Sequence, residues 1–155
     1  MDAMNTGTAA NDKQKLSNVR DALLDLHKAL VDSERVSYEK TVGAIQSPNQ
    51  FLQLLTSDPW FAWLHPISLL IVTMDEAMEE KEPLTRELIS TLLDQLRRLL
   101  IASEIGEGFS RHYFDALQAD NAQNDPDDAG NRVKDTTDGL EARVESLYQL
   151  KYPAD

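Results

Sequence analysis

The chain has 155 residues, no cysteine, and 27 acidic against 15 basic residues, which gives a formal net charge of −12. This length suits one domain with a hydrophobic core of its own. The absence of cysteine excludes disulfides, thiolate metal sites and cysteine nucleophiles. So acidic a chain argues against nucleic acid and anionic membranes as partners, because both bind a basic face.

The first segment, residues 1–12, is polar and has neither a basic start nor an apolar block. We expect a disordered tail there, without a signal peptide, and a single helical domain over residues 13–150. The longest apolar stretch, Ile67 to Met74, is much shorter than the roughly 20 residues that span a bilayer. The sequence therefore predicts no membrane span and a cytoplasmic location.

A long helix is predicted from Asp12 onwards. Its apolar residues recur at spacings of three and four, which is typical of a buried helical face, and they are Leu16, Val19, Leu23, Leu26 and Leu30. A second stripe lies beside the first and comprises Leu24, His27, Val31, Glu34 and Tyr38. Two stripes indicate that this helix packs against more than one neighbour, and the pattern continues through Val42 and Ile45.

Two proline-containing segments are typical helix starts. In Ser47–Gln50 the serine can cap, the proline suits the first helical position, and the glutamine can reach back as in a capping box. Asp58 and Pro59 form a second helix start of the same kind, with a hydrogen-bond acceptor at the cap and a proline after it. Trp60 and Trp63 follow at helical spacing, and Pro66 is expected to kink or break the helix because it removes one backbone hydrogen bond.

Three further segments are predicted in the second half of the chain. Glu82–Pro83 is expected to begin a helix whose buried register is Leu84, Leu88, Leu92, Leu96 and Leu99, and Gly106 and Gly108 mark its end or a hinge. A shorter helix is outlined by Phe109, Tyr113, Ala116 and Leu117. After a polar loop at 121–131, a last helix carries a narrow apolar seam of Val133, Thr137, Leu140, Val144 and Leu147.

These elements predict an all-α fold, an up-and-down bundle of four main helices plus one or two short helices. We expect its core to include Leu23, Leu30, Trp60, Trp63, Pro66, Leu92 and Leu96. The seam of the last helix, set among acidic residues, suits packing on the bundle or coiled-coil pairing with a second copy of the chain.

The three histidines, His27, His65 and His112, fall on different predicted helices. If they converge, they would form a transition-metal site of the kind that zinc prefers. The spacing does not support such a site, because neither an H-E-x-x-H nor an E-x-x-H motif is present. The segment His27-Lys28-Ala29 also invites comparison with histidine-phosphotransfer bundles, but these carry a glycine where this chain has Ala29.

Other polar residues give no catalytic constellation. Glu76, Glu79 and Glu82 share a face, as do Glu104 and Glu107, and a solvated acidic surface is the simplest interpretation of both. A polar set near the apolar faces comprises Glu34, Tyr38, Arg97, Arg98, Glu104 and Tyr113. If two of these meet inside, they must pair, because a lone buried charge is costly. Such a network would be the best candidate for a small-molecule pocket.

One motif carries a family resemblance. The run Leu54-Leu55-Thr56-Ser57-Asp58-Pro59-Trp60-Phe61-Ala62-Trp63-Leu64-His65-Pro66-Ile67-Ser68 contains a D-P-x-F-A-W-L-x-P-x-S core. It resembles a family of small bacterial helical proteins without assigned function, over about residues 15–120. The resemblance implies a helical bundle and supplies neither an activity nor site residues.

Taken together, these patterns favour a non-catalytic interaction or regulatory module that binds a protein partner or a second copy of itself, with no cofactor. The alternative is a bundle that binds a metal or small ligand through the scattered histidines and nearby carboxylates. No nucleophile elbow and no P-loop is present, and an enzyme of another type ranks last.

Overall fold

The computed structural model describes the backbone of residues 2–80, 84–101, 108–123 and 129–151, and the side chains of 11–80, 84–101, 108–118 and 133–147. These residues form an all-α fold, as predicted. The helices are α1 (Asp2–Thr41), α2 (Pro48–Ser57), the 3₁₀ helix η1 (Pro59–Leu64), α3 (His65–Glu79), α4 (Arg86–Leu99), α5 (Phe109–Gln123) and α6 (Ala129–Lys151).

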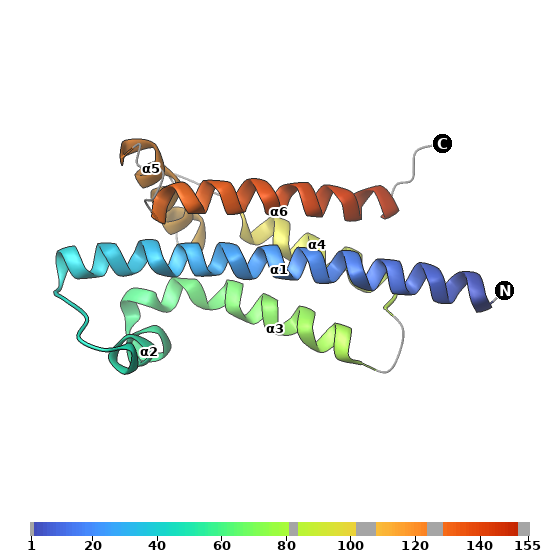
Figure 1. Ribbon diagram of the computed structural model, residues 1–155, viewed down its shortest axis with the longest axis horizontal. Coiled ribbons are helices and arrows are strands. Elements are labelled where there is room, and N and C mark those ends of the chain that lie inside the picture. The colour runs from blue at the N-terminus through green and yellow to red at the C-terminus, as the bar shows by residue number, and fades with distance from the viewer. Residues whose placement is uncertain (1, 81–83, 102–107, 124–128, 152–155) are drawn as a thin grey trace.

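Four long helices build an up-and-down bundle around α1 (Figure 1). α1 and α4 run in one direction, and α3 and α6 run in the other. α2 and α5 sit at the end of the bundle away from the N-terminus of α1. The most extensive packing joins α1 to α6, followed by α5 to α6 and α1 to α3. α1 therefore has several neighbours, which explains why its sequence carries two stripes.

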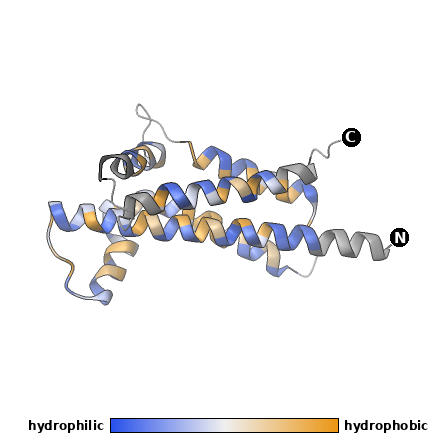
Figure 2. Cartoon of the chain, turned by 45° about the horizontal axis from the view of Figure 1, so that its top comes forward, coloured by the Kyte–Doolittle hydropathy of each residue, from blue (hydrophilic) through white to orange (hydrophobic). Residues whose placement is uncertain are grey.

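The core follows the apolar spacing of α1. Figure 2 shows hydrophobic and hydrophilic residues alternating along the helices, as expected where each helix has one covered face. The first predicted stripe of α1, Leu16, Val19, Leu23, Leu26 and Leu30, is fully buried. Ala22 and Ala29 are buried beside it, and such small side chains leave room for larger residues of the neighbouring helices. Leu92, Leu96 and Trp63 join the same core, as predicted.

Two predicted core residues lie elsewhere. Pro66 is exposed, and Trp60 is only half-buried against the core. Pro66 stands in the first turn of α3, where the N–H that proline lacks is not needed. It marks the expected break, because the 3₁₀ turn before it ends at Leu64 and the α-helix begins at His65.

The capping predictions hold at α2 and η1. The Ser47 hydroxyl accepts a hydrogen bond from the Gln50 N–H at 3.1 Å, and Gln50 reaches back to the N–H of Gln46, one residue before the cap. The Asp58 carboxylate accepts from the Trp60 N–H at 2.8 Å. Asp58 starts a 3₁₀ helix, a form that the sequence pattern did not predict.

The start and face of α4 differ from the prediction. Glu82–Pro83 lies outside the described residues, and α4 begins at Arg86 with Thr85 as its cap. The buried face comprises Ile89, Leu92, Leu93 and Leu96, whereas Leu88 is 39% exposed. Leu84 and Leu99 pack at the edge of the core. The predicted four-residue ladder drifts around the helix, because 3.6 residues make one turn.

The remaining predictions concern the N-terminal segment, the loop at 121–131 and the glycines before α5. α1 begins at Asp2, so the described backbone is helical through the segment predicted as a tail, and Asp12 is buried. α5 and α6 extend into the loop predicted at 121–131, of which residues 124–128 lie outside the described part. Gly106 lies outside it too, whereas Gly108 has a φ of 61° and directly precedes α5. Among the described residues, no helix is both long and apolar enough to cross a membrane.

The seam of α6 is covered by the chain itself. Val133, Leu140, Val144 and Leu147 are all buried, with Leu140 at 0% exposure. Of the two alternatives for this seam, packing on the bundle is therefore the one that the fold shows.

Candidate functional site

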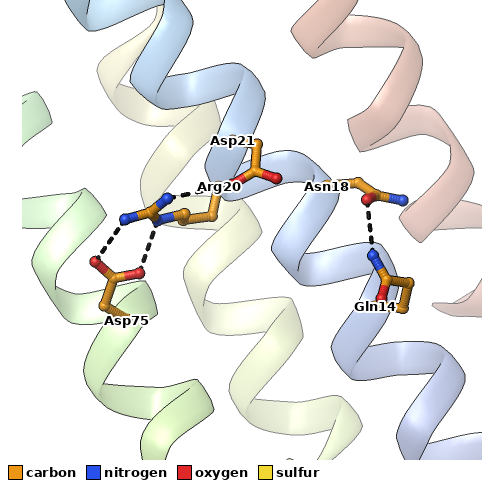
Figure 3. Close-up of polar contacts among 5 residues, drawn as sticks. All are labelled: Gln14, Asn18, Arg20, Asp21 and Asp75. Carbon is orange, nitrogen blue, oxygen red and sulfur yellow. Dashed lines mark hydrogen bonds and ion pairs between the residues drawn. The ribbon is translucent and has the colours of Figure 1, made fainter.

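The seam between α1 and α3 is held by two polar pairs. Arg20 donates to both carboxylate oxygens of Asp75, at 2.7 and 3.1 Å, and also contacts Asp21 (Figure 3). Nearer to η1, the Nε2 atom of His27 lies 2.8 Å from the Ser68 hydroxyl. Arg20 and His27 are two helical turns apart, and so are Ser68 and Asp75, so the pairs fix an antiparallel register.

Between these pairs the seam exposes apolar side chains. Leu24 of α1 is 41% exposed, and Leu69 and Val72 of α3 are 55% and 50% exposed. The register of the two pairs places Leu24 level with the turn of α3 that carries Val72, because both lie between the ion pair and the histidine. Leu24 and Val72 therefore lie at the same level of this interface, and together with Leu69, which is exposed about one turn before Val72 on α3, we call them the seam patch.

A half-open groove adjoins the seam patch. It has a volume of about 770 Å³ and lies between α1, α2, η1 and α3. Its apolar wall is formed by Leu55, Pro59, Phe61, Ala62 and Leu64, and its polar lining by His27, Thr56, Ser57, Asp58, His65 and Ser68. A volume in the range of about 300–1,000 Å³ with mostly apolar walls and few polar groups is typical of ligand sites.

His27 is the best-placed polar group in the groove. Burial lowers the pKa of its imidazole, so the neutral ring is favoured. A neutral ring offers one donor and one acceptor nitrogen, and Nε2 is paired with Ser68 in either tautomer. Because the ring is half-buried and paired in this way, His27 differs from the exposed, free-standing histidine of a phosphotransfer bundle.

The three histidines do not converge. His27 and His65 line the same groove. His112 instead stacks on Trp63, with ring centroids 4.9 Å apart and an interplanar angle of 13°. Within the described part of the chain, no group of three or more His, Asp or Glu side chains is arranged to hold a metal ion. The predicted three-histidine metal site is therefore not formed.

Glu34 lies under the two tryptophans of η1. A 3₁₀ helix has three residues per turn, so Trp60 and Trp63 project from the same side. Burial raises the pKa of the Glu34 carboxyl, and the nearby indole N–H groups partly oppose that rise. The Nε1 atoms of Trp60 and Trp63 are both buried, and neither makes a hydrogen bond within the described part of the chain. The sequence placed Glu34 near an apolar face but did not reveal its tryptophan partners, because they come from η1, a separate segment whose packing on α1 spacing does not predict.

Two members of the predicted polar set meet at a second cavity. Arg97 and Tyr113 both line a space of about 330 Å³ between α4, α5 and α6. Tyr113 is buried, and its hydroxyl lies 2.9 Å from that of Thr137. Tyr38 contacts the rings of Trp60 and Phe61 instead. Arg98 is exposed, and Glu104 lies outside the described residues.

The acidic faces agree with solvated surfaces where they are described. Glu76 and Glu79 are exposed near the end of α3, while Glu82 and Glu107 lie outside the described residues.

The sequence did not reveal Ser68 as the partner of His27, although its place in an otherwise apolar run was a signal. The helical spacing of this run predicted a buried side with Ile67, Leu70, Ile71 and Met74, which are buried, and it left out Leu69 and Val72, which are exposed.

Comparison with protein-family models, with curated proteins and with solved structures finds no match to this chain. The candidate site therefore depends on its own geometry, and the resemblance of the tryptophan motif to a bacterial helical family stays a prediction.

Proposed function

We propose that this chain is a non-catalytic interaction module that takes an apolar helical segment of a protein partner into the groove beside the seam patch. The observation that carries the proposal is the continuity of two features. His27 and Ser68 line the half-open groove, and on the same helices exposed Leu24 lies about one turn from His27 and exposed Leu69 directly follows Ser68.

The chemistry of this surface suits a helix in a groove. An amphipathic helix presents apolar anchors three and four residues apart, which insert into an apolar cleft and cover exposed residues at its edge. The mostly apolar wall of the groove and the side chains of Leu69 and Val72 provide both parts. The net charge of −12 favours a partner whose flanking residues are basic, since opposite charges accelerate association.

The proposal is tested with a displayed library of helical peptides and two charge-matched variants. The groove variant is Leu69→Glu, named for the groove beside which Leu69 lies without lining it, and the control is Leu88→Glu, which alters an exposed leucine on α4. We expect selection to enrich amphipathic peptides, whose affinity falls about tenfold or more in the groove variant and stays unchanged in the control. Enrichment of no peptide, or equal losses in the two variants, would contradict the proposal.

A second candidate is a small-ligand site in the same groove. The observation in its favour is the polar pair of His27 and Ser68 set in an apolar wall, because a few placed polar groups commonly orient a small molecule. A fragment screen followed through the chemical shifts of Ser68 and Phe61 distinguishes the candidates. A small ligand in the groove should shift the resonances of these residues, and the Leu69→Glu substitution should not change its affinity.

A further inference from the structure

A separate cavity lies between α4, α5 and α6 and shares no lining residue with the groove. Its volume is about 330 Å³. The inner wall is apolar and is formed by Leu96, Leu100, Leu140 and Val144, and Tyr113 and Thr137 supply its hydroxyl groups. Arg97, Glu141 and Glu145 complete the lining and are exposed, so they stand at the mouth.

The hydroxyl pair has a fixed direction. The Thr137 hydroxyl donates its single hydrogen to the backbone carbonyl of Val133, at 2.8 Å. Tyr113 must therefore donate in the 2.9 Å contact with Thr137. Both hydrogens of the pair are used within the protein, so the phenol oxygen of Tyr113 offers the cavity lone pairs and no donor.

The mouth has an excess of negative charge. Glu141 and Glu145 are one turn apart on α6, and Arg97 is the one basic residue among the described residues that line the cavity. Burial raises the pKa of the Tyr113 hydroxyl, its hydrogen bond with Thr137 opposes that rise, and the negative charges of Glu141 and Asp138 add to it. A ligand thus meets acceptors and carboxylates around an apolar space.

We propose that this cavity binds a small organic amine in its protonated form, with its apolar body between α4 and α6 and its ammonium group at Glu141 and Glu145. An ammonium group supplies the donors that Tyr113 and the carboxylates lack. The apolar body replaces water along Leu96 and Leu140. This site extends the proposed interaction function and does not depend on it.

The test compares three probes of the same shape: cyclohexylmethylamine, cyclohexylmethanol and cyclohexanecarboxylate. Binding is followed through the methyl resonances of Leu140 and Val144 in the full chain. We expect the amine to bind about tenfold more tightly than the alcohol, because a charge-assisted hydrogen bond is stronger than a neutral one. The carboxylate is expected to bind more weakly than both.

Two variants locate the ammonium group. Glu141→Gln combined with Glu145→Gln should abolish the preference for the amine over the alcohol. The matched control, Glu87→Gln combined with Asp135→Asn, removes two exposed charges that do not line the cavity and should keep the preference. Tyr113→Phe, checked for folding by circular dichroism, should weaken the amine more than the alcohol.

Three results would overturn the proposal. Equal affinity for amine and alcohol would show apolar filling without charge recognition. Tighter binding of the carboxylate, lost in Arg97→Gln, would assign the cavity to an anion. No shift of the methyl resonances with any probe at millimolar concentration would show that the cavity is not a binding site. The groove variant Leu69→Glu should bind the amine normally, so failure here and failure of the proposed function are distinguishable.

Discussion

The two sides of α1 are built differently. Against α6, the contact is extensive, and the facing seam of α6 buries Val133, Leu140, Val144 and Leu147. Against α3, the contact is smaller and contains the Arg20–Asp75 ion pair, the His27–Ser68 pair and a half-exposed leucine between them. Both sides bury apolar residues, since Ile67, Leu70, Ile71 and Met74 of α3 are buried as well, but the α3 side adds polar pairs and an exposed leucine.

This difference separates stability from recognition. Apolar burial is the dominant favourable contribution to folding and has little direction. Polar pairs contribute little net free energy but fix which turn of one helix meets which turn of the other. Because its contact with α1 is the more extensive one, the α6 side is expected to contribute more to stability than the α3 side. The α3 side is expected to set the register that positions the groove, and it can be altered without unfolding the chain.

The largest expected effect is on the α6 side. Leu140→Ala removes most of a side chain that is 0% exposed and should lower the free energy of unfolding by about 2–5 kcal/mol, because it leaves a cavity. The matched variant Leu69→Ala, at 55% exposure, should change it by less than about 0.5 kcal/mol. Urea denaturation followed by tryptophan fluorescence measures both. Similar losses in the two variants would remove the distinction between the sides.

An intermediate effect is expected at the His27–Ser68 pair. Ser68→Ala leaves the half-buried imidazole without its hydroxyl partner and should cost about 1 kcal/mol of stability. Thr73→Ala is the control, because the Thr73 hydroxyl is exposed and bonds only to the Leu69 carbonyl of its own helix. The comparison is made by urea denaturation at pH 8. An unchanged midpoint for Ser68→Ala would show that the pair does not stabilise the seam.

A smaller effect is expected at the ion pair. Arg20 and Asp75 are partly exposed, with side-chain exposures of 28% and 35%, so water and salt screen their attraction. A double-mutant cycle with Arg20→Ala and Asp75→Ala should give a coupling energy of about 0.2–1 kcal/mol that declines in high salt. A coupling well above this range, or one that salt leaves unchanged, would place the pair among the main contributors to stability.

The sequence predicted the apolar side of the molecule better than the polar one. Leu16, Leu23 and Leu30 repeat at helical spacing and are fully buried, because burial of apolar residues follows directly from periodicity. The partner of His27 is Ser68, which lies 41 residues away along the chain. Their contact depends on the register between α1 and α3. A single sequence carries no direct record of that register.

The same limit explains the errors around η1. Trp60 and Trp63 share one side in an α-helix as in the 3₁₀ helix that they form, and their approach to Glu34 depends on how η1 packs against α1, which spacing does not reveal. Proline in the first turn of a helix and proline within a helix look alike when the boundary is uncertain by a few residues. Pro66 was therefore placed in the core, although it is exposed at the start of α3.

The last prediction concerns pH and two titratable groups of α1 that are shifted in opposite senses. The pKa of His27 is lowered from 6.5 by burial, so the unfolded chain takes up the proton first. The contribution of His27 is therefore fully present above pH 6.5 and is lost as the pH falls from there through the lowered pKa of the folded chain. The pKa of Glu34 is raised from 4.5, mainly by burial. Its contribution is fully present below pH 4.5 and is lost as the pH rises towards the raised value.

The variants His27→Gln and Glu34→Gln isolate the two contributions, since neither glutamine titrates. The stability of wild type relative to His27→Gln should decrease as the pH is lowered from 8 to 5.5, and its stability relative to Glu34→Gln should decrease as the pH is raised from 4 to 7. Parallel urea denaturations across this range measure the differences, with the exposed Glu87→Gln as control. A His27 difference that does not vary with pH would show that the imidazole has the same pKa in the folded and the unfolded chain, so that its burial on the α3 side does not disfavour the charged ring.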